Sequence, residues 1–153
     1  MRLKILVLAP LLLLLCAACE PQPSIDNPIE WGPKVSYYNN QLRVSGNGRF
    51  YNDAASRAAN LMSVADENND GNTVYGVTDF YFWLYDSGCN CSQYKETGRQ
   101  STNEWENSTH SQTLKWNLDI ASNSVRGASF VCAQMGWPVP NSCSSAALPT
   151  FSY

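Results

Sequence analysis

Several catalytic signatures are missing from this chain of 153 residues. It contains no Gly-x-Ser-x-Gly elbow, no His-Glu-x-x-His pair, no P-loop and no dinucleotide-binding fingerprint. Its one histidine, His110, stands in a polar stretch, where an exposed titrating side chain is commoner than a general base. Carboxylate chemistry would need two acids that converge across a cleft, but Asp79 and Asp86 lie seven residues apart and point to opposite faces of a strand. The sequence therefore predicts no enzyme, and a carboxylate-dependent hydrolase is a weak alternative.

Basic residues are scarce beyond the N-terminus. From Glu20 onward the chain has eight lysines and arginines against thirteen aspartates and glutamates, a formal charge of −5. No basic cluster remains, so nucleic acid and anionic membrane surfaces are poor candidate partners. No apolar run reaches the roughly 20 residues that a membrane-spanning helix needs. We therefore expect contact with a membrane only through an N-terminal lipid.

The first 19 residues have the layout of a secretory signal peptide. Arg2 and Lys4 precede an apolar run at 5–15, and small residues follow at 16–19. The apolar run is too short for a comfortable transmembrane helix. We therefore assign residues 1–19 as a signal peptide.

The cleavage region points to a lipoprotein. Ala17-Ala18-Cys19 resembles the end of a bacterial lipobox, although Cys16 stands where such motifs usually have leucine. The resemblance implies that Cys19 is lipid-modified and becomes the new N-terminus. We expect a lipoprotein on the outer side of the cell membrane, with free secretion as the alternative.

Four cysteines remain in the mature domain: Cys89, Cys91, Cys132 and Cys143. In an exported protein they are expected to form disulfides. Cysteines at i and i+2 bond to each other only with strain, so the sequence predicts Cys89–Cys132 with Cys91–Cys143, or the swapped pairing. Either pairing would tie the middle of the chain to its C-terminal region.

The mature chain is predicted to be mainly β. Residues 20–33 contain four prolines and are read as a tether that would hold the domain clear of a membrane, with Trp31 docking onto it. Residues 34–153 are rich in Asn, Ser, Thr and Tyr, which suits strands joined by polar turns. We predict one disulfide-bonded domain, an antiparallel β-sandwich or flattened barrel.

The longest run of strong strand formers is the central strand expected at Asn72–Asp86. Alternation gives it two faces. One face carries Phe80, Phe82 and Leu84, and the other carries Asp79, Tyr81, Trp83 and Tyr85. The first face predicts a hydrophobic core. The second is either covered by another layer or displayed to a ligand.

A displayed Tyr81, Trp83 and Tyr85 would form a flat platform with polar rims, with Asp79 beside it. Aromatic rings stack on the apolar surfaces of sugars and anchor protein interfaces. The sequence thus favours a small binding protein for a glycan or protein ligand. The alternative is a secreted inhibitor or partner-binding protein that acts through its loops, with candidates at Gly46–Gly48, Glu67–Gly71 and Gln100–Ser111.

Two segments are ambiguous. At most one short helix is expected, over about residues 54–65, because its alanines and Leu61 and Met62 share a helical face; a strand that starts near Ala59 is the alternative. Gly46-Asn47-Gly48 favours positive φ and predicts a tight turn or a bulge.

The turn Asp66–Gly71 has the acidic and amide spacing that opens an EF-hand loop, with Asp66, Asn68 and Asp70 as candidate calcium ligands. The twelfth position, which should supply a bidentate carboxylate, is Val77. A solvated turn is therefore the favoured interpretation, and no cofactor is expected beyond this weak calcium candidate.

The second half of the chain contains further strands. Residues 113–120 alternate strictly, which predicts a half-buried strand with Leu114, Trp116, Leu118 and Ile120 inward. A core strand is expected at 125–135 and a short final strand at 150–153. The polar stretch 97–112 is read as a long loop or an edge.

Overall fold

The computed structural model describes residues 22–153, and every helix-or-strand element in that range is a β-strand. In chain order the strands are β1 (Ile29–Tyr38), β2 (Gln41–Asp53), β3 (Arg57–Asp66), β4 (Val74–Asp86), β5 (Cys91–Ser101), β6 (Thr109–Asn117), β7 (Ser124–Ala133), β8 (Ser142–Cys143) and β9 (Thr150–Ser152). The predicted central strand is β4, which begins two residues later than expected.

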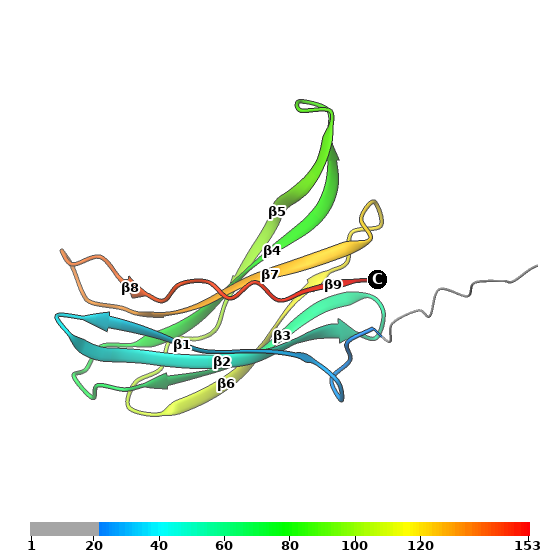
Figure 1. Ribbon diagram of the computed structural model, residues 1–153. Helices are drawn as coiled ribbons and strands as arrows, with labels where there is room; N and C mark the ends of the chain where they lie inside the picture. Colours follow the sequence, from blue (N-terminus) through cyan, green and yellow to red (C-terminus); the bar gives the residue numbers. More distant parts are fainter. Residues whose placement is uncertain (1–21) are drawn as a thin grey trace, which may run out of the picture.

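Two antiparallel sheets pack face to face (Figure 1). One sheet has the order β1-β2-β3-β6, and the other has the order β5-β4-β7-β8 with β9 also paired to β7. The chain builds β1 to β3 by hairpins, crosses to the other sheet for β4 and β5, returns for β6 and crosses again for β7. The predicted antiparallel β-sandwich is confirmed.

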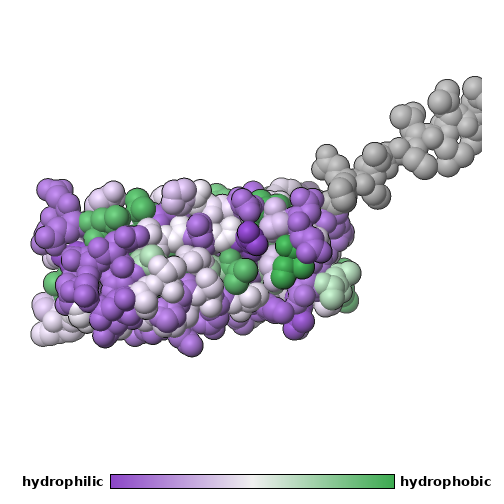
Figure 2. All heavy atoms as spheres, turned by 90° about the horizontal axis from the view of Figure 1, so that it is seen from below, coloured by the Kyte–Doolittle hydropathy of each residue, from purple (hydrophilic) through white to green (hydrophobic). Residues whose placement is uncertain are grey.

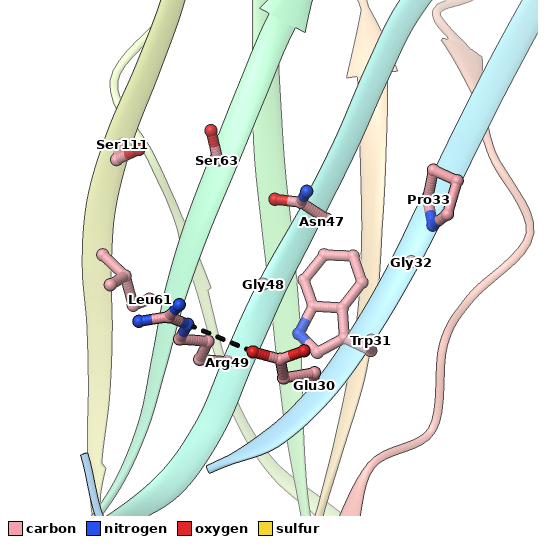
Figure 3. A pocket seen from close by; sticks show the side chains of 10 residues that line it. All are labelled: Glu30, Trp31, Gly32, Pro33, Asn47, Gly48, Arg49, Leu61, Ser63 and Ser111. Atoms are coloured by element: carbon pink, nitrogen blue, oxygen red, sulfur yellow. Dashed lines mark ion pairs between the residues drawn. The ribbon is translucent and has the colours of Figure 1, made fainter. Parts of the chain in front are cut away.

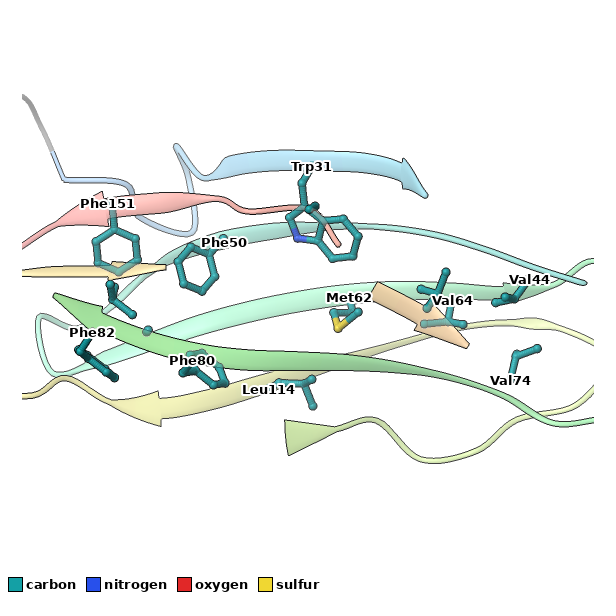
Figure 4. Close-up of a cluster of buried hydrophobic side chains, with 14 of the residues drawn as sticks. Trp31, Val44, Phe50, Met62, Val64, Val74, Phe80, Phe82, Leu114 and Phe151 are labelled. Carbon is teal, nitrogen blue, oxygen red and sulfur yellow. The ribbon is translucent and has the colours of Figure 1, made fainter. Parts of the chain in front are cut away.

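The core lies between the inward faces of the two sheets (Figure 4). Phe80 and Phe82 of β4 are fully buried, as their alternation predicts. The ring of Trp116 on β6 stacks on Phe80 with centroids 6.1 Å apart, so the two predicted strands do share a core. The cluster also includes Val44, Phe50, Met62, Val64, Val74, Leu114, Val125, Val131 and Phe151.

β1 begins at Ile29, inside the predicted tether of residues 20–33. Trp31 is buried, and its indole N–H donates a hydrogen bond to Asn60 Oδ1 at 2.9 Å. Pro33 fits because β1 lies at the edge of its sheet and its register shifts after Trp31. Prolines exclude the interior of a sheet but not its edge, so the predicted tether is too long.

Gly46–Gly48 lies inside β2, so the expected tight turn is wrong. The register with β1 does shift opposite this segment, between the Trp31–Gly48 and Lys34–Gly46 pairs, with the extra residue on β1. β2 pairs with β3 without a register shift across this segment. The glycines allow close packing instead. A Cβ on Gly48 would lie 2.6 Å from the indole of Trp31, and one on Gly46 would lie 2.5 Å from Val131 of the other sheet.

β3 replaces the short helix that was expected over about residues 54–65. Ala54 and Ala55 form the turn before it, with φ of 53° and 57°. β3 is hydrogen-bonded by β2 on one side and by β6 on the other. Pairing on both edges overrides the helix propensity of alanine, so the helix is wrong and the alternative strand is right.

Two further differences concern the second half of the chain. The polar stretch 97–112 divides between the edge strand β5, a connection at 102–108 and the start of β6. Ile120, expected to point inward, is fully exposed because β6 ends at Asn117 and Ile120 lies in the following turn. The alternation of apolar and polar residues thus extends beyond the end of β6, and it does not mark where the strand stops.

Both disulfides differ from the expected pairings. Cys89 bonds to Cys91 after β4, and Cys132 of β7 bonds to Cys143, its partner on β8. The hairpin turn holds the Cα atoms of Cys89 and Cys91 5.3 Å apart, within the usual span of a disulfide. The expected strain of an i, i+2 bond therefore did not exclude it.

Two disulfides in one small domain indicate an oxidising, extracellular-type environment. Residues 22–153 include no helix of the length and apolarity that crossing a bilayer requires. The predicted signal peptide, residues 1–19, and the predicted lipid site Cys19 lie outside the described residues.

Candidate functional site

The outer face of β4 carries the aromatic side chains that the sequence singles out. Because Phe80 and Phe82 face the core, their neighbours Tyr81, Trp83 and Tyr85 face outward. Trp83 is 40% exposed and Tyr85 is 63% exposed, whereas Tyr81 is half-buried. Trp83 and Tyr85 are thus displayed to solvent.

Trp83 and Tyr85 stand on a two-stranded arm, the part of the β4–β5 hairpin from Trp83 to Tyr94. β7 pairs with β4 only as far as Phe82, so the arm has lost its third strand. In Figure 1 this green hairpin rises away from both layers. A free two-stranded hairpin is marginally stable in water, so the arm needs braces of its own.

Asp86 braces the end of the arm. Its carboxylate accepts the backbone N–H of Gly88 at 2.8 Å and the amide of Gln93 at 2.6 Å, and it pairs with Lys95 Nζ at 3.1 Å. The Gly88 N–H above all, and then Lys95 and Gln93, lower the pKa of Asp86. The carboxylate thus joins the turn to the first half of β5.

Two further bonds close the tip. The hydroxyl of Tyr85 donates to Asn90 Oδ1, and the Cys89–Cys91 disulfide spans the last residues of the turn. Neither bond reaches the sandwich. Their effect is confined to the shape of the arm.

Neighbouring strands contribute Tyr94 and Arg126. Tyr94 on β5 stands opposite Trp83 and meets its ring edge-on, with centroids 5.0 Å apart at 65°. The Arg126 guanidinium on β7 lies 3.9 Å from the centroid of the Tyr94 ring, and the Tyr94 hydroxyl is 2.9 Å from Ser124 Oγ. We call the set Tyr81, Trp83, Tyr85 and Tyr94 the aromatic face.

Asp79 lies beneath Arg99 rather than beside the exposed rings. The Asp79 carboxylate is buried and receives two hydrogen bonds from the Arg99 guanidinium, one of 2.8 Å from Nη2. This bidentate pair raises the pKa of Arg99 and ties β5 to β4. Asp79 therefore positions the strand under the aromatic face, and both its oxygens are engaged.

Tyr81 closes the inner border of the aromatic face. Its hydroxyl donates to Glu96 Oε2 at 3.3 Å. Burial raises the pKa of Tyr81, and the Glu96 carboxylate adds to the shift. Tyr81 thus stays a neutral phenol, and its hydroxyl lies at the polar rim.

A shallow hollow of about 440 Å³ lies on the opposite side of the molecule, on the outer face of the β1-β2-β3-β6 sheet (Figure 3). Arg49 pairs with Glu30 at 3.6 Å, and Leu61 is an apolar residue of the lining. The remaining lining includes Asn47, Ser63 and Ser111. Figure 2, seen from the side of β1, β2 and β6, shows a mostly hydrophilic surface with scattered apolar residues. This hollow offers polar groups but no exposed aromatic ring.

The calcium candidates are engaged in turn contacts. Asp66 accepts the backbone N–H groups of Asn68 at 3.1 Å and Asn107 at 2.9 Å. Asp70 pairs with Arg43 and accepts the N–H of Asn72 at 3.1 Å. Within residues 22–153 no three His, Cys, Asp or Glu side chains group in a way that could hold a metal ion. These contacts support the interpretation as a solvated turn.

Sequence reasoning missed Tyr94 and Arg126 because it assigned no strand after the turn at 86–92. A hairpin interpretation of that turn would have placed Tyr94 across from Trp83. Arg126 carries no such signal, since its approach to Tyr94 depends on the pairing of β7 with β4. Comparison of the chain with protein-family models, curated proteins and solved structures finds no match.

Proposed function

We propose that this chain is an exported binding protein that holds a glycan or protein ligand on its aromatic face. The observation that carries the proposal is the exposed indole of Trp83 on a braced arm. Burying aromatic surface is favourable, so core packing alone does not account for an indole left exposed on a stiffened hairpin. A ligand that stacks on Trp83 and Tyr85 would bury that surface.

The rim of the aromatic face suits a ligand with both apolar and polar parts. Arg126 over Tyr94 supplies donors next to the exposed rings, and the Tyr81 hydroxyl with its Glu96 partner supplies acceptors. Sugars combine apolar C–H surfaces with hydroxyls, and protein hot spots combine aromatic anchors with arginine. Both ligand classes match this chemistry.

The proposal is of binding without catalysis. Asp79 is held by Arg99, and Asp86 is held by Gly88, Gln93 and Lys95. Neither carboxylate is free to act as an acid or base. A general acid–base pair would need both groups open to the same cleft.

Glycan microarrays and pull-down on purified cell-wall polysaccharide test the glycan ligand, and cross-linking from the arm tests a protein ligand. The proposal predicts one saturable ligand whose binding protects the arm from amide exchange. Protection confined to another part of the sandwich would contradict it.

We further propose export through the signal peptide and attachment by a lipid on Cys19. The disulfides support an oxidising destination, and free secretion is the alternative. Mass spectrometry of the mature N-terminus separates the two. An acylated Cys19 is the expected result, and an unmodified peptide that starts at Glu20 or later contradicts the anchor.

A second candidate is an inhibitor or partner-binding protein that acts through loops. The turn at 67–71 and the connection at 102–108 lie at the end of the sandwich away from the arm. Trp137, almost fully exposed, lies in the β7–β8 connection at the same end. A partner that cross-links through 102–108 and spares the arm would favour this function.

A further inference from the structure

One end of the sandwich receives the start of the described chain, and we call it the anchor end. It contains residues 22–28, the β2–β3 turn at 54–56 and the β6–β7 turn at 118–123. The N–H of Asn52 donates to the carbonyl of Pro23 at 2.8 Å, and the N–H of Leu118 donates to the carbonyl of Ser56 at 2.9 Å. Figure 1 shows the chain entering at this end, beside the C-terminus.

The β6–β7 turn of the anchor end displays a fully exposed isoleucine, Ile120. The turn is braced rather than loose. Asp119 Oδ1 accepts the N–H of Ala121 at 2.9 Å, and the carbonyl of Asp119 accepts the hydroxyl of Tyr153 at 2.7 Å. The isoleucine is thus held outward by the bonds around it.

A second isoleucine projects from the same end. Ile25 is largely exposed at the tip of a tight turn in which Ser24 and Asn27 exchange backbone hydrogen bonds of 3.2 and 3.1 Å. Single exposed apolar residues are common on protein surfaces and need no explanation alone. What matters here is that both lie where the chain leaves for Cys19.

The distance from the anchor end to Cys19 is short. Gln22 is fastened to the domain, since its side-chain oxygen accepts the Asn52 amide at 2.5 Å. Three Cα–Cα steps separate Gln22 from Cys19, so they span at most about 11 Å. A lipid on Cys19 would therefore enter its bilayer within about 11 Å of the anchor end.

We infer that the anchor end rests on the bilayer that holds the Cys19 lipid, with Ile25 and Ile120 in the headgroup region. The inference rests on the lipid anchor proposed above and goes beyond it, since a lipid alone specifies no orientation. Apolar side chains at the interface add a second membrane contact to the acyl chains. Because the connection between Cys19 and the domain is short, the lipid holds the anchor end at a high effective concentration near the bilayer.

The charges of the anchor end indicate which lipid headgroups it would contact. Asp53 is paired with Arg57 at 2.9 Å and with Lys115 at 2.8 Å. Asp26 and Asp119 remain without an ion pair among the described residues. This balance disfavours anionic lipid and fits a zwitterionic headgroup layer.

The inferred orientation separates the two candidate ligand sites. The β7–β8 connection with Trp137 lies at the other end of β7, a strand of ten residues and about 30 Å in length. The arm leaves the sandwich at the end where β7 begins, because β4 extends beyond its last pair with β7. The aromatic face would therefore meet its ligand near the membrane, and Trp137 would face away.

The test uses the mature acylated protein in phosphatidylcholine vesicles that contain a headgroup nitroxide lipid. Two variants, Ile120→Cys and Trp137→Cys, carry the same thiol-linked fluorophore; both positions are exposed, so the fold tolerates the label. We expect nitroxide quenching of the label at 120 to exceed that at 137 at least threefold. Amide exchange of residues 118–123 should also slow in vesicles relative to detergent.

Each outcome bears on a separate claim. Equal or reversed quenching in protein whose mass shows the lipid overturns the orientation and leaves the anchor intact. A mature protein without lipid overturns the anchor and the orientation together. An Ile25→Ser/Ile120→Ser variant that stays acylated and retains full protection of residues 118–123 would also overturn the role of the isoleucines.

Discussion

Asn60 on β3 donates a hydrogen bond to Ser129 Oγ on β7 at 2.8 Å, and this bond joins the two sheets in the middle of the core. The same amide donates to Thr78 Oγ1 on β4 at 2.7 Å, and Asn60 Oδ1 accepts the indole N–H of Trp31 at 2.9 Å. All four side chains are buried. A satisfied polar group at this position favours one alignment of the sheets over others.

Replacing Asn60 by alanine should lower the free energy of unfolding by about 2–4 kcal/mol. The substitution leaves the Trp31 N–H unsatisfied inside the core and removes the amide donor of the Thr78 and Ser129 hydroxyls, which keep only their 3.3 Å contact with each other and that of Thr78 with Met62 Sδ. A buried donor without an acceptor is costly. Urea denaturation measures the loss. Asn47→Ala, on the exposed face of the same sheet, is the matched control and should change stability by less than about 0.5 kcal/mol. Equal effects of the two variants would contradict the role of the network.

Gly98→Ala should destabilise the sandwich by about 1–3 kcal/mol. A Cβ at this position of β5 would lie 2.2 Å from the Trp116 ring, which covers the glycine from the other sheet. Gly88→Ala is the control, because a Cβ there meets only the flexible Asp86 carboxylate at 3.2 Å. Thermal unfolding measures the difference. An equal melting temperature for Gly98→Ala and Gly88→Ala would show that the sheets do not approach this closely.

The two disulfides should differ in their effect on stability. The chain-entropy model assigns about 3 kcal/mol to the Cys132–Cys143 loop, which spans eleven residues in sequence, and about 1.5 kcal/mol to the Cys89–Cys91 loop. Double alanine variants of each pair, compared by urea denaturation, measure the difference. The Cys89/Cys91 variant should keep a stable sandwich and loosen only the arm. A larger loss from that variant would contradict this division.

The arm should loosen in acid. The Gly88 N–H, Lys95 and Gln93 lower the pKa of Asp86, so its contribution to stability is present above the unfolded aspartate pKa of about 3.9 and is lost as pH falls through the folded value. Amide protection factors for residues 84–95 should therefore drop below about pH 4. In the Asp86→Asn variant the arm should be as loose at pH 7 as the unchanged protein is in acid. Its protection factors should therefore show no drop near pH 4. A pH step that survives in this variant would assign the effect to another group.

The sequence predicted the strands whose pattern is local. The alternation in β4 placed Phe80 and Phe82 in the core and Trp83 on the opposite face of the strand, because a period of two specifies the faces of a strand without any partner. The sandwich class followed from the turn-rich composition and several such strands. The exposure of Trp83 could not follow, since it depends on where β7 stops pairing with β4.

Two of the wrong predictions failed because the outcome depends on partners distant in sequence. Alanines favour a helix locally, but pairing on both edges of β3 decides the segment. Two glycines predict a turn locally, but the indole of Trp31 needs the space over Gly48. The disulfide pairing failed for the opposite reason. A local turn, not a distant contact, brings Cys89 to Cys91.

The aromatic face is tested most directly by the affinity of Trp83→Ala for the ligand recovered from the glycan or cross-linking screens. The matched control is Trp137→Ala, which removes an equally large exposed ring from the opposite end of the sandwich. Titration calorimetry should show binding at least tenfold weaker for Trp83→Ala, a loss of about 1.4 kcal/mol or more, and unchanged for Trp137→Ala. Undiminished binding by a folded Trp83→Ala protein would contradict the proposed site.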